Sequence, residues 1–238
     1  ADDLHLTAYY HDFSDKQIKE FPKSNKITFK NLNKVDEMIT YREEMKLHDG
    51  TEGGKMPYNW RLDAIKWCHK VYALTDFSFK LVEKSVQAGW VVWLDADIIL
   101  KKPVNKQDLF GIIPLGSELV HLGRKDVDYS ETSFMAFNLN TIPPLDLLGD
   151  MRGFYNSHEV LSYREWHDGF IFERLFNIYG AHGLKKHSLT PDVRGLDAFN
   201  NSPLADYFEH FKGNRKDLLS NKTTPDVVGP KRYKQLAD

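Results

Sequence analysis

The sequence has a single cysteine and no long hydrophobic run, and these two shortages exclude several classes of protein. Cys68 alone cannot form an intrachain disulfide, so a small secreted domain held together by disulfides is excluded. No segment reaches the length of about 18 apolar residues that a membrane-spanning helix needs. The first residues also lack the basic and apolar regions of a targeting signal. We therefore expect no integral membrane segment and a reducing, cytoplasmic location.

The chain also lacks an excess of charge of one sign. Its 32 lysine and arginine residues nearly balance its 34 acidic residues, which gives a formal net charge of -2. Nucleic acids and anionic membranes are usually bound by strongly positive surfaces, so a nucleic-acid partner is disfavoured. A small neutral or acidic ligand fits better. Composition leaves the oligomeric state open.

What the chain does have is enough apolar sequence for one sizeable core, with 41% hydrophobic positions in 238 residues. Strand and helix patterns alternate, as is typical of a layered α/β domain. Periodicity predicts strands over 4–10, 27–29, 90–94 and 133–139, and helices over 35–47, 59–74, 78–87 and 166–179. Ser162 and Glu165 are candidates for a capping box ahead of the last helix, and Pro143 and Pro144 are interpreted as a break.

The clearest chemical signal lies where the apolar strand 90–94 ends. Asp95 and Asp97 follow directly, at a spacing that puts both side chains on the same side of an extended segment. Ligands of open α/β sheets bind beyond the carboxyl ends of the strands, so the two carboxylates are placed to hold one divalent cation and phosphates. A solvated turn is the alternative for this short motif alone. Its position after a buried strand favours the metal site.

A phosphatase of the haloacid-dehalogenase type is the first alternative. That family also places Asp-x-Asp after an apolar strand and uses the first Asp as a nucleophile. It usually continues with a small residue and then Thr or Val, whereas Ile98 and Ile99 follow here. A sugar nucleotidyltransferase would instead need a glycine-rich loop after the first strand, and residues 8–12 contain no glycine. The phosphatase is therefore kept as an alternative and is not the favoured interpretation.

A second signal lies near the C-terminus, where His210, Gly213 and Lys216 form a His-x-x-Gly-x-x-Lys segment. Together with Asp-x-Asp, this segment resembles the GT-A-fold glycosyltransferases, and most closely the family-eight type that includes glycogenin and bacterial galactosyltransferases. The resemblance implies a Rossmann-type, mainly parallel sheet flanked by helices. It covers a single domain over residues 1–216 and leaves 217–238 as a polar C-terminal extension.

The resemblance also implies an activity and a set of roles. The chain would transfer a sugar from a nucleotide-diphosphate donor, with UDP the expected nucleotide, to a glycan or small-molecule hydroxyl, with retention of configuration. His210 would be the third metal ligand beside Asp95 and Asp97, a set that favours Mn²⁺ over Mg²⁺. Gly213 would let backbone approach the diphosphate, and Lys216 would offset its growing charge. A sugar-nucleotide-binding protein without turnover is the second alternative.

Two further acidic residues come from partial motif matches. The family's Asn-Ala-Gly is matched only by residues 131–133, and its Asp-Gln pair becomes Asp168 and Gly169. By the resemblance Asp168 would contact the donor sugar. Glu131, a carboxylate where the family has an amide, would orient the acceptor or act as its general base. The family's Pro-Trp ending is absent, because Asp217 and Leu218 follow Lys216.

The last candidates are basic and aromatic residues. Arg61 and Lys66 precede the Asp-x-Asp strand, where they could bind a phosphate or the sugar, although a solvated helix face is the more common place for such residues. Tyr9, with Tyr10, ends the first strand and could stack on the nucleotide base. Packing against the core explains the tyrosine pair almost as well.

Overall fold

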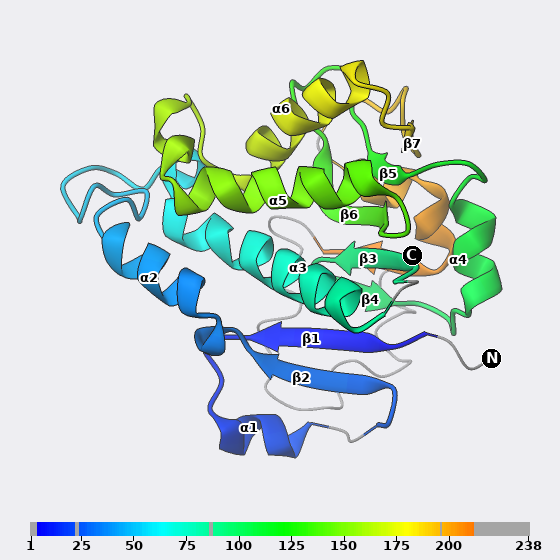
Figure 1. The fold of residues 1–238 in the computed structure, drawn as a ribbon, viewed down its shortest axis with the longest axis horizontal. Helices are drawn as coiled ribbons and strands as arrows, with labels where there is room; N and C mark the ends of the chain where they lie inside the picture. Colours follow the sequence, from blue (N-terminus) through cyan, green and yellow to red (C-terminus); the bar gives the residue numbers. More distant parts are fainter. Residues whose placement is uncertain (1–3, 22–23, 86–87, 196, 212–238) are drawn as a thin grey trace, which may run out of the picture.

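A computed structural model describes residues 4–21, 24–85, 88–195 and 197–211 (Figure 1). Strands in three sheets are flanked by helices, so the predicted α/β class is confirmed. The largest sheet has the order β3-β6-β5-β7, and the bounds of these strands are Trp90–Leu94, Glu131–Asn138, Leu119–Leu122 and Lys186–Ser188. A second sheet pairs β1 (Leu6–Tyr10) with β2 (Ile27–Asn31), and a third pairs β4 (Ile98–Leu100) with β8 (Phe208–His210).

The expectation of a mainly parallel sheet needs correction. Among the described strands, β1 and β2 run parallel, as do β5 and β7. The other pairs, β3 with β6, β5 with β6 and β4 with β8, are antiparallel. A continuous apolar run marks a strand that is buried on both faces, and such a run does not fix the direction of the neighbouring strands.

Strand β6 is buried on both faces because a core packs against each of them. Met135 and Phe137 join one hydrophobic cluster, which includes side chains from α3 (Ala64–Lys84), α5 (Ile142–Asn156) and α6 (Asp168–Ala181). Phe134 and Ala136 join a second cluster on the other face. Near its start the strand has an irregularity: Met135 pairs with His121, but the next residue of β5 pairs with Glu131. This bulge changes which face the first residues of β6 present.

The remaining helices lie farther out, with α1 beyond β2 (Figure 1). Helix α2 spans Asp36–Glu44 and packs against α3, and the shorter helices are α1 (Asp15–Glu20) and α4 (Lys106–Ile112). Within the described part of the chain, no helix combines the length and the apolar character that crossing a bilayer requires. Residues 217–238 lie outside the described residues, so the predicted domain boundary stays a prediction.

Helix α3 is one continuous helix, where the sequence pattern predicted two, over 59–74 and 78–87. No glycine or proline interrupts it, and the hydroxyl of Thr75 donates back to the carbonyl of Val71, which satisfies that polar side chain inside the helix. The helix begins after Asp63, whose carboxylate accepts the backbone N–H of Lys66 at 2.8 Å. One rigid rod therefore runs from the loop 48–63 past the end of β3.

The break predicted at Pro143 and Pro144 and the cap predicted at Ser162 were both wrong. Pro143 and Pro144 lie in the first turn of α5, where their missing N–H groups would have no helical partner anyway. Helix α6 begins at Asp168, because Nδ1 of His167 accepts the backbone N–H of Phe170 at 3.2 Å. The expected cap, Ser162, donates its hydroxyl to the carbonyl of Glu159 instead.

His121 is a titratable group inside this fold. It lies in β5, its Nδ1 is 2.7 Å from the hydroxyl oxygen of Ser130, and its ring packs 4.2 Å from the ring of Phe176 in α6. Burial lowers the pKa of His121 to about 3, and the nearby positive charge of Lys186 acts in the same direction. The imidazole is therefore neutral in the folded protein at neutral pH.

This burial predicts a loss of stability in mild acid. In the unfolded chain a histidine has a pKa of about 6.5 and takes up a proton in mild acid, whereas His121 in the folded protein stays neutral. The free energy of unfolding therefore falls as the pH drops from about 6.5 towards 3. His121 should contribute a loss of about 1.4 kcal/mol between pH 7.5 and 5.5. Urea unfolding at several pH values should show a smaller dependence of the free energy of unfolding on pH in His121→Gln. The exposed control His182→Gln should show the dependence of the unaltered protein. An identical slope in His121→Gln would contradict the assignment.

Candidate functional site

The carboxyl end of β3 brings together the three residues predicted to bind metal. Asp95 follows the strand, and its backbone N–H donates to the carbonyl of Ser133 in β6 at 3.0 Å. Strand β4 then pairs with β8, which places His210 opposite Ile98. As a result Nε2 of His210 lies 3.2 Å from Oδ1 of Asp97. Residues more than a hundred positions apart in the sequence thus meet through one short antiparallel pair.

The geometry of this cluster fits a divalent cation. One ligand atom from each of Asp95, Asp97 and His210 lies within 4.8 Å of the others. Around an octahedral ion with bonds of about 2.1 Å, ligand atoms lie about 3 to 4 Å apart, so only small side-chain movements are needed. Two hard carboxylates with one imidazole suit Mn²⁺ or Mg²⁺ and leave positions for phosphate oxygens. The donor set is therefore consistent with the predicted site.

His210 is held from behind by Glu131, and both side chains are buried. Nδ1 of His210 lies 2.9 Å from Oε1 of Glu131. The glutamate also accepts the backbone N–H of Ala198 at 2.9 Å and the hydroxyl of Ser133 at 3.0 Å. A carboxylate on the far nitrogen of an imidazole fixes the ring and leaves the other nitrogen to face a metal. This placement makes Glu131 a support for His210.

The two carboxylates also change the charge of His210. Burial by itself lowers the pKa of the imidazole, but the hydrogen bonds to Asp97 and Glu131 outweigh it and raise the pKa to about 9. A metal ion can bind only the unprotonated nitrogen, so binding a cation here would release this proton.

Lys70 is the centre of a second group of contacts. Its ammonium lies 2.9 Å from Oδ1 of Asp95 and 2.8 Å from Oδ2 of Asp168, with side chains that are 11% exposed for Lys70 and 2% for Asp168. It also donates to the carbonyl of Thr132 at 3.1 Å, and the hydroxyl of Thr132 donates to Asp168 at 2.6 Å. Lys70 therefore ties α3, β6 and the start of α6 to the end of β3.

Both members of the buried pair stay charged. Burial on its own lowers the pKa of Lys70, but Asp168 and Asp95 raise it above its usual range. Burial likewise raises the pKa of Asp168, but Lys70 outweighs it and lowers that pKa. The carboxylates of Asp95, Asp97, Asp168 and Glu131 thus face two cations, Lys70 and protonated His210, which leaves a formal charge of -2. Binding of a divalent cation, with release of the proton from His210, would reduce this formal charge to -1.

Sequence reasoning missed Lys70, although a signal was present. Lys70 lies three residues after Trp67 and four before Leu74, which places it beside the apolar stripe of α3. A lysine in such a stripe is rarely buried without a carboxylate partner. The pattern therefore pointed to an ion pair in the core, without revealing which acid would supply it.

The other predicted residues make their contacts outside the metal cluster. Tyr9 donates its hydroxyl to Asp76 of α3 at 2.6 Å and packs against the core, an engagement that favours the packing interpretation. Arg61 lies with its Nε 3.3 Å from Oε2 of Glu165, and Lys66 lies beside the hydroxyl of Tyr58. Gly213 and Lys216 fall outside the described residues, so their roles stay predictions.

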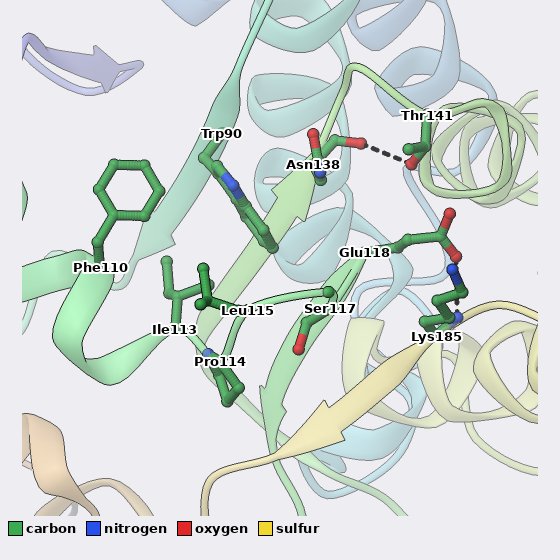
Figure 2. Close-up of a pocket in the computed structure, with 11 residues that line it drawn as sticks. Trp90, Phe110, Ile113, Pro114, Leu115, Ser117, Glu118, Asn138, Thr141 and Lys185 are labelled. Atoms are coloured by element: carbon green, nitrogen blue, oxygen red, sulfur yellow. Dashed lines mark hydrogen bonds between the residues drawn. The ribbon is translucent and has the colours of Figure 1, made fainter.

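A separate cavity of about 280 Å³ lies at the opposite end of β3. Trp90, the first residue of the strand, lines it together with Ile113 and Pro114 (Figure 2). On its other side the carboxylate of Glu118 accepts the backbone N–H of Lys185 at 2.9 Å. None of the metal-cluster residues lines this cavity. The titratable groups that could support chemistry gather at the other end of the strand.

Comparison with known proteins gives one structural similarity. No family model matches the chain, and no curated protein matches it. Among solved structures, the chain is similar to mouse xyloside xylosyltransferase 1 in its apo form, with 14% identity and a TM-score of 0.45. The similarity covers 78% of this chain and 71% of the mouse chain.

The buried ion pair predicts a stability effect. Lys70→Met should leave Asp168 buried without its cation and lower the free energy of unfolding by about 3 kcal/mol, measured by urea denaturation. The double variant Lys70→Met with Asp168→Asn should recover part of that loss, because the unpaired charge is gone. The control Lys80→Met breaks an i,i+4 pair whose lysine is 51% exposed, and should cost less than about 1 kcal/mol. Equal losses for the two lysines would contradict the pairing.

The support of His210 by Glu131 predicts an effect on metal affinity. Glu131→Gln keeps an acceptor for the imidazole N–H but removes the charge, and should weaken Mn²⁺ binding about 10- to 100-fold, measured by electron paramagnetic resonance of free Mn²⁺. The matched control is Glu173→Gln, whose carboxylate accepts from the backbone N–H and hydroxyl of Ser130. Unchanged affinity in a folded Glu131→Gln variant would contradict the role.

Proposed function

We propose that this protein is a metal-dependent glycosyltransferase that takes a sugar from a nucleotide-diphosphate donor, with UDP as the nucleotide. The observation that carries the proposal is the convergence of Asp95, Asp97 and His210 at the carboxyl end of β3, next to the buried pair of Lys70 and Asp168. A divalent cation with open positions at this edge is suited to hold a diphosphate. The acceptor is a hydroxyl group of a glycan or small molecule, and the protein acts in the cytoplasm.

Each residue of the site has a distinct role in this proposal. Asp95, Asp97 and His210 would hold Mn²⁺ or Mg²⁺, which when bound stabilises negative charge on the departing diphosphate. Lys70 fixes Asp95 in place and keeps Asp168 ionised inside the protein. Asp168 is a fixed acceptor for hydroxyl groups of the donor sugar. Gly213 and Lys216 would contact the diphosphate, as the sequence resemblance implies.

The surroundings of the two candidate bases support retention of configuration. An inverting transferase needs a carboxylate within reach of the attacking hydroxyl that can take up its proton. Glu131 is buried with both oxygens engaged, by His210 and by the N–H of Ala198. Asp168 is buried against Lys70, which lowers its pKa and makes it a weaker base. In a retaining reaction the departing diphosphate itself helps to take the proton, so neither residue is needed for that step.

The first test concerns the metal cluster. Asp97→Asn should lower Mn²⁺-dependent UDP binding, measured by calorimetry, on the order of 100-fold or more, because it removes one charged ligand. The thermal midpoint should change little. The exposed control Asp206→Asn, which lies just before β8, should bind as the unaltered protein does. UDP binding that needs no metal, or that survives Asp97→Asn, would contradict the proposed ligand set.

The second test concerns the reaction. With Mn²⁺ and a panel of UDP-sugars and hydroxyl acceptors, we expect release of UDP and a product whose anomeric configuration, read by NMR of the first product, equals that of the donor. A product with inverted anomeric configuration would instead indicate that Glu131 or Asp168 acts as the general base. Donor binding without UDP release would indicate a binding protein. Release of inorganic phosphate from phosphomonoesters would indicate the phosphatase alternative.

A further inference from the structure

An exposed aromatic surface lies beside the candidate site. The loop 48–63 ahead of α3 runs alongside the segment ahead of α6 (Figure 1), and the backbone N–H of Trp166 donates to the carbonyl of Arg61 at 2.7 Å. The loop presents Tyr58, which is 53% exposed, and Trp60, which is 36% exposed. Together with Lys66 and Trp67 of α3 they form what we name the aromatic ledge.

The ledge is a built surface, because its parts are fixed by specific contacts. Gly50 has a φ of +78°, and a Cβ there would come within 2.9 Å of the ring of Tyr58, so only glycine lets that ring lie against the backbone. The backbone N–H of Asn59 donates to the carbonyl of Gly50 at 2.7 Å. The indole N–H of Trp67 donates to the carbonyl of Trp60 at 2.6 Å. The loop and the helix therefore hold the rings in one arrangement.

Lys66 supplies a positive charge in the middle of the ledge. Its ammonium lies 3.3 Å from the hydroxyl oxygen of Tyr58, and 5.8 Å and 4.9 Å from the ring centres of Tyr58 and Trp67. The nearby Asp63 is engaged by the hydroxyl of Tyr58 and by the backbone N–H of Lys66. Within the residues that the structure describes, no carboxylate forms an ion pair with the Lys66 ammonium.

The other cation of this surface is already neutralised. Arg61 lies over the ring of Trp60, but its Nε is 3.3 Å from Oε2 of Glu165. The same carboxylate oxygen lies 3.0 Å from Nε2 of His167. Lys66 is therefore the cation of the ledge that is available to an anionic group of a ligand.

The ledge adjoins the proposed transfer site. Lys66 and Lys70 are four residues apart in α3, so they lie one turn from each other on the same side of the helix, with Cβ atoms about 6 Å apart. Lys70 contacts Asp95 and Asp168 directly. The ring of Trp67 lies 5.9 Å from the ring of His167, the residue before Asp168. A sugar bound beside Lys66 would thus lie about one helical turn from Lys70 and the carboxylates that it contacts.

We propose that the aromatic ledge binds the acceptor, and that this acceptor is an acidic glycan whose sugar ring carries a carboxylate. The inference rests on the proposed transferase function and names the acceptor class of the same site. The apolar face of a sugar ring packs on the exposed face of Tyr58, as aromatic side chains in ligand sites commonly allow. The carboxylate pairs with the ammonium of Lys66. One cation matches a monoanion, whereas a phosphate dianion would add negative charge beside a site that already has an excess.

The test measures acceptor binding alone, by NMR titration without donor or metal. The probes are matched pairs of methyl glycosides: glucuronide with glucoside, and galacturonide with galactoside. The acid of at least one pair should bind about 5- to 10-fold more tightly than its neutral partner, as expected for one charge-assisted contact. Lys66→Gln should reduce the acid's affinity to that of the neutral glycoside. Lys84→Gln, an exposed lysine on the same helix, should preserve the preference.

The aromatic contribution has its own variants. Tyr58→Leu should weaken the acid and neutral glycosides alike, and Tyr58→Phe, which keeps the ring, should bind both nearly as well as the unaltered protein. Equal affinities within every pair, or a preference for the acid that persists in Lys66→Gln, would overturn the proposal. A preference lost equally in Lys84→Gln would also overturn it, because the attraction would then be a general effect of charge.

These outcomes are separate from those of the proposed function. If the acid preference depends on Lys66 but no donor releases UDP, the transferase proposal fails and the ledge stands as a glycan-binding surface. If UDP release requires a neutral acceptor and the ledge shows no preference for acids, the transferase stands and the acceptor assignment fails.

Discussion

The ammonium of Lys70 between Asp95 and Asp168 is the interaction on which the rest of the site depends. Lys70 and Asp168 are buried, so either charge would be costly if it lacked its partner. The contacts of Lys70 reach β3, β6, α3 and α6, so the elements must dock together before the charges are satisfied. We infer that the carboxylates at the end of β3 are held in place by the folding of the core itself.

The opposite side of the cluster is held by a different device. The short β4 and β8 pair brings His210 to Asp97, and Glu131 fixes the ring from behind. Glu131, which contacts His210, and Thr132, which contacts Asp168, are adjacent in β6. Four carboxylates face two cationic side chains in this cluster, and a divalent cation would reduce the excess of negative charge. Carboxylates held close together repel one another in the metal-free state, and a bound cation relieves this repulsion.

The sequence predicted some parts of this arrangement well, for physical reasons. The bounds of β3 agree with the structure because its apolar run is bounded by Gly89 and by Asp95. Asp95, Asp97 and His210 could be grouped by their spacing and by resemblance to a family. Lys70 could not be paired with Asp168 in this way, because a contact across 98 positions of sequence depends on packing that periodicity does not encode. The direction of β6 was missed for the same reason, since it depends on tertiary contacts. The continuity of α3 and the N-cap of α6 involve local hydrogen bonds of Thr75 and His167, which the apolar periodicity does not encode either.

The bulge near the start of β6 has a consequence for how this protein can change over evolution. The regular part of the strand sends alternate residues into two separate cores, and the irregular part aims Glu131 at His210 and Thr132 at Lys70. In the irregular part, four steps along β6, from Met135 to Glu131, lie opposite one step along β5. A one-residue deletion there would turn one of these side chains to the other face or shift both cores out of register. Variation in this strand is therefore confined to replacing side chains at constant length. The loop 48–63, which carries no strand of the sheets, is where insertions can reshape what the protein recognises.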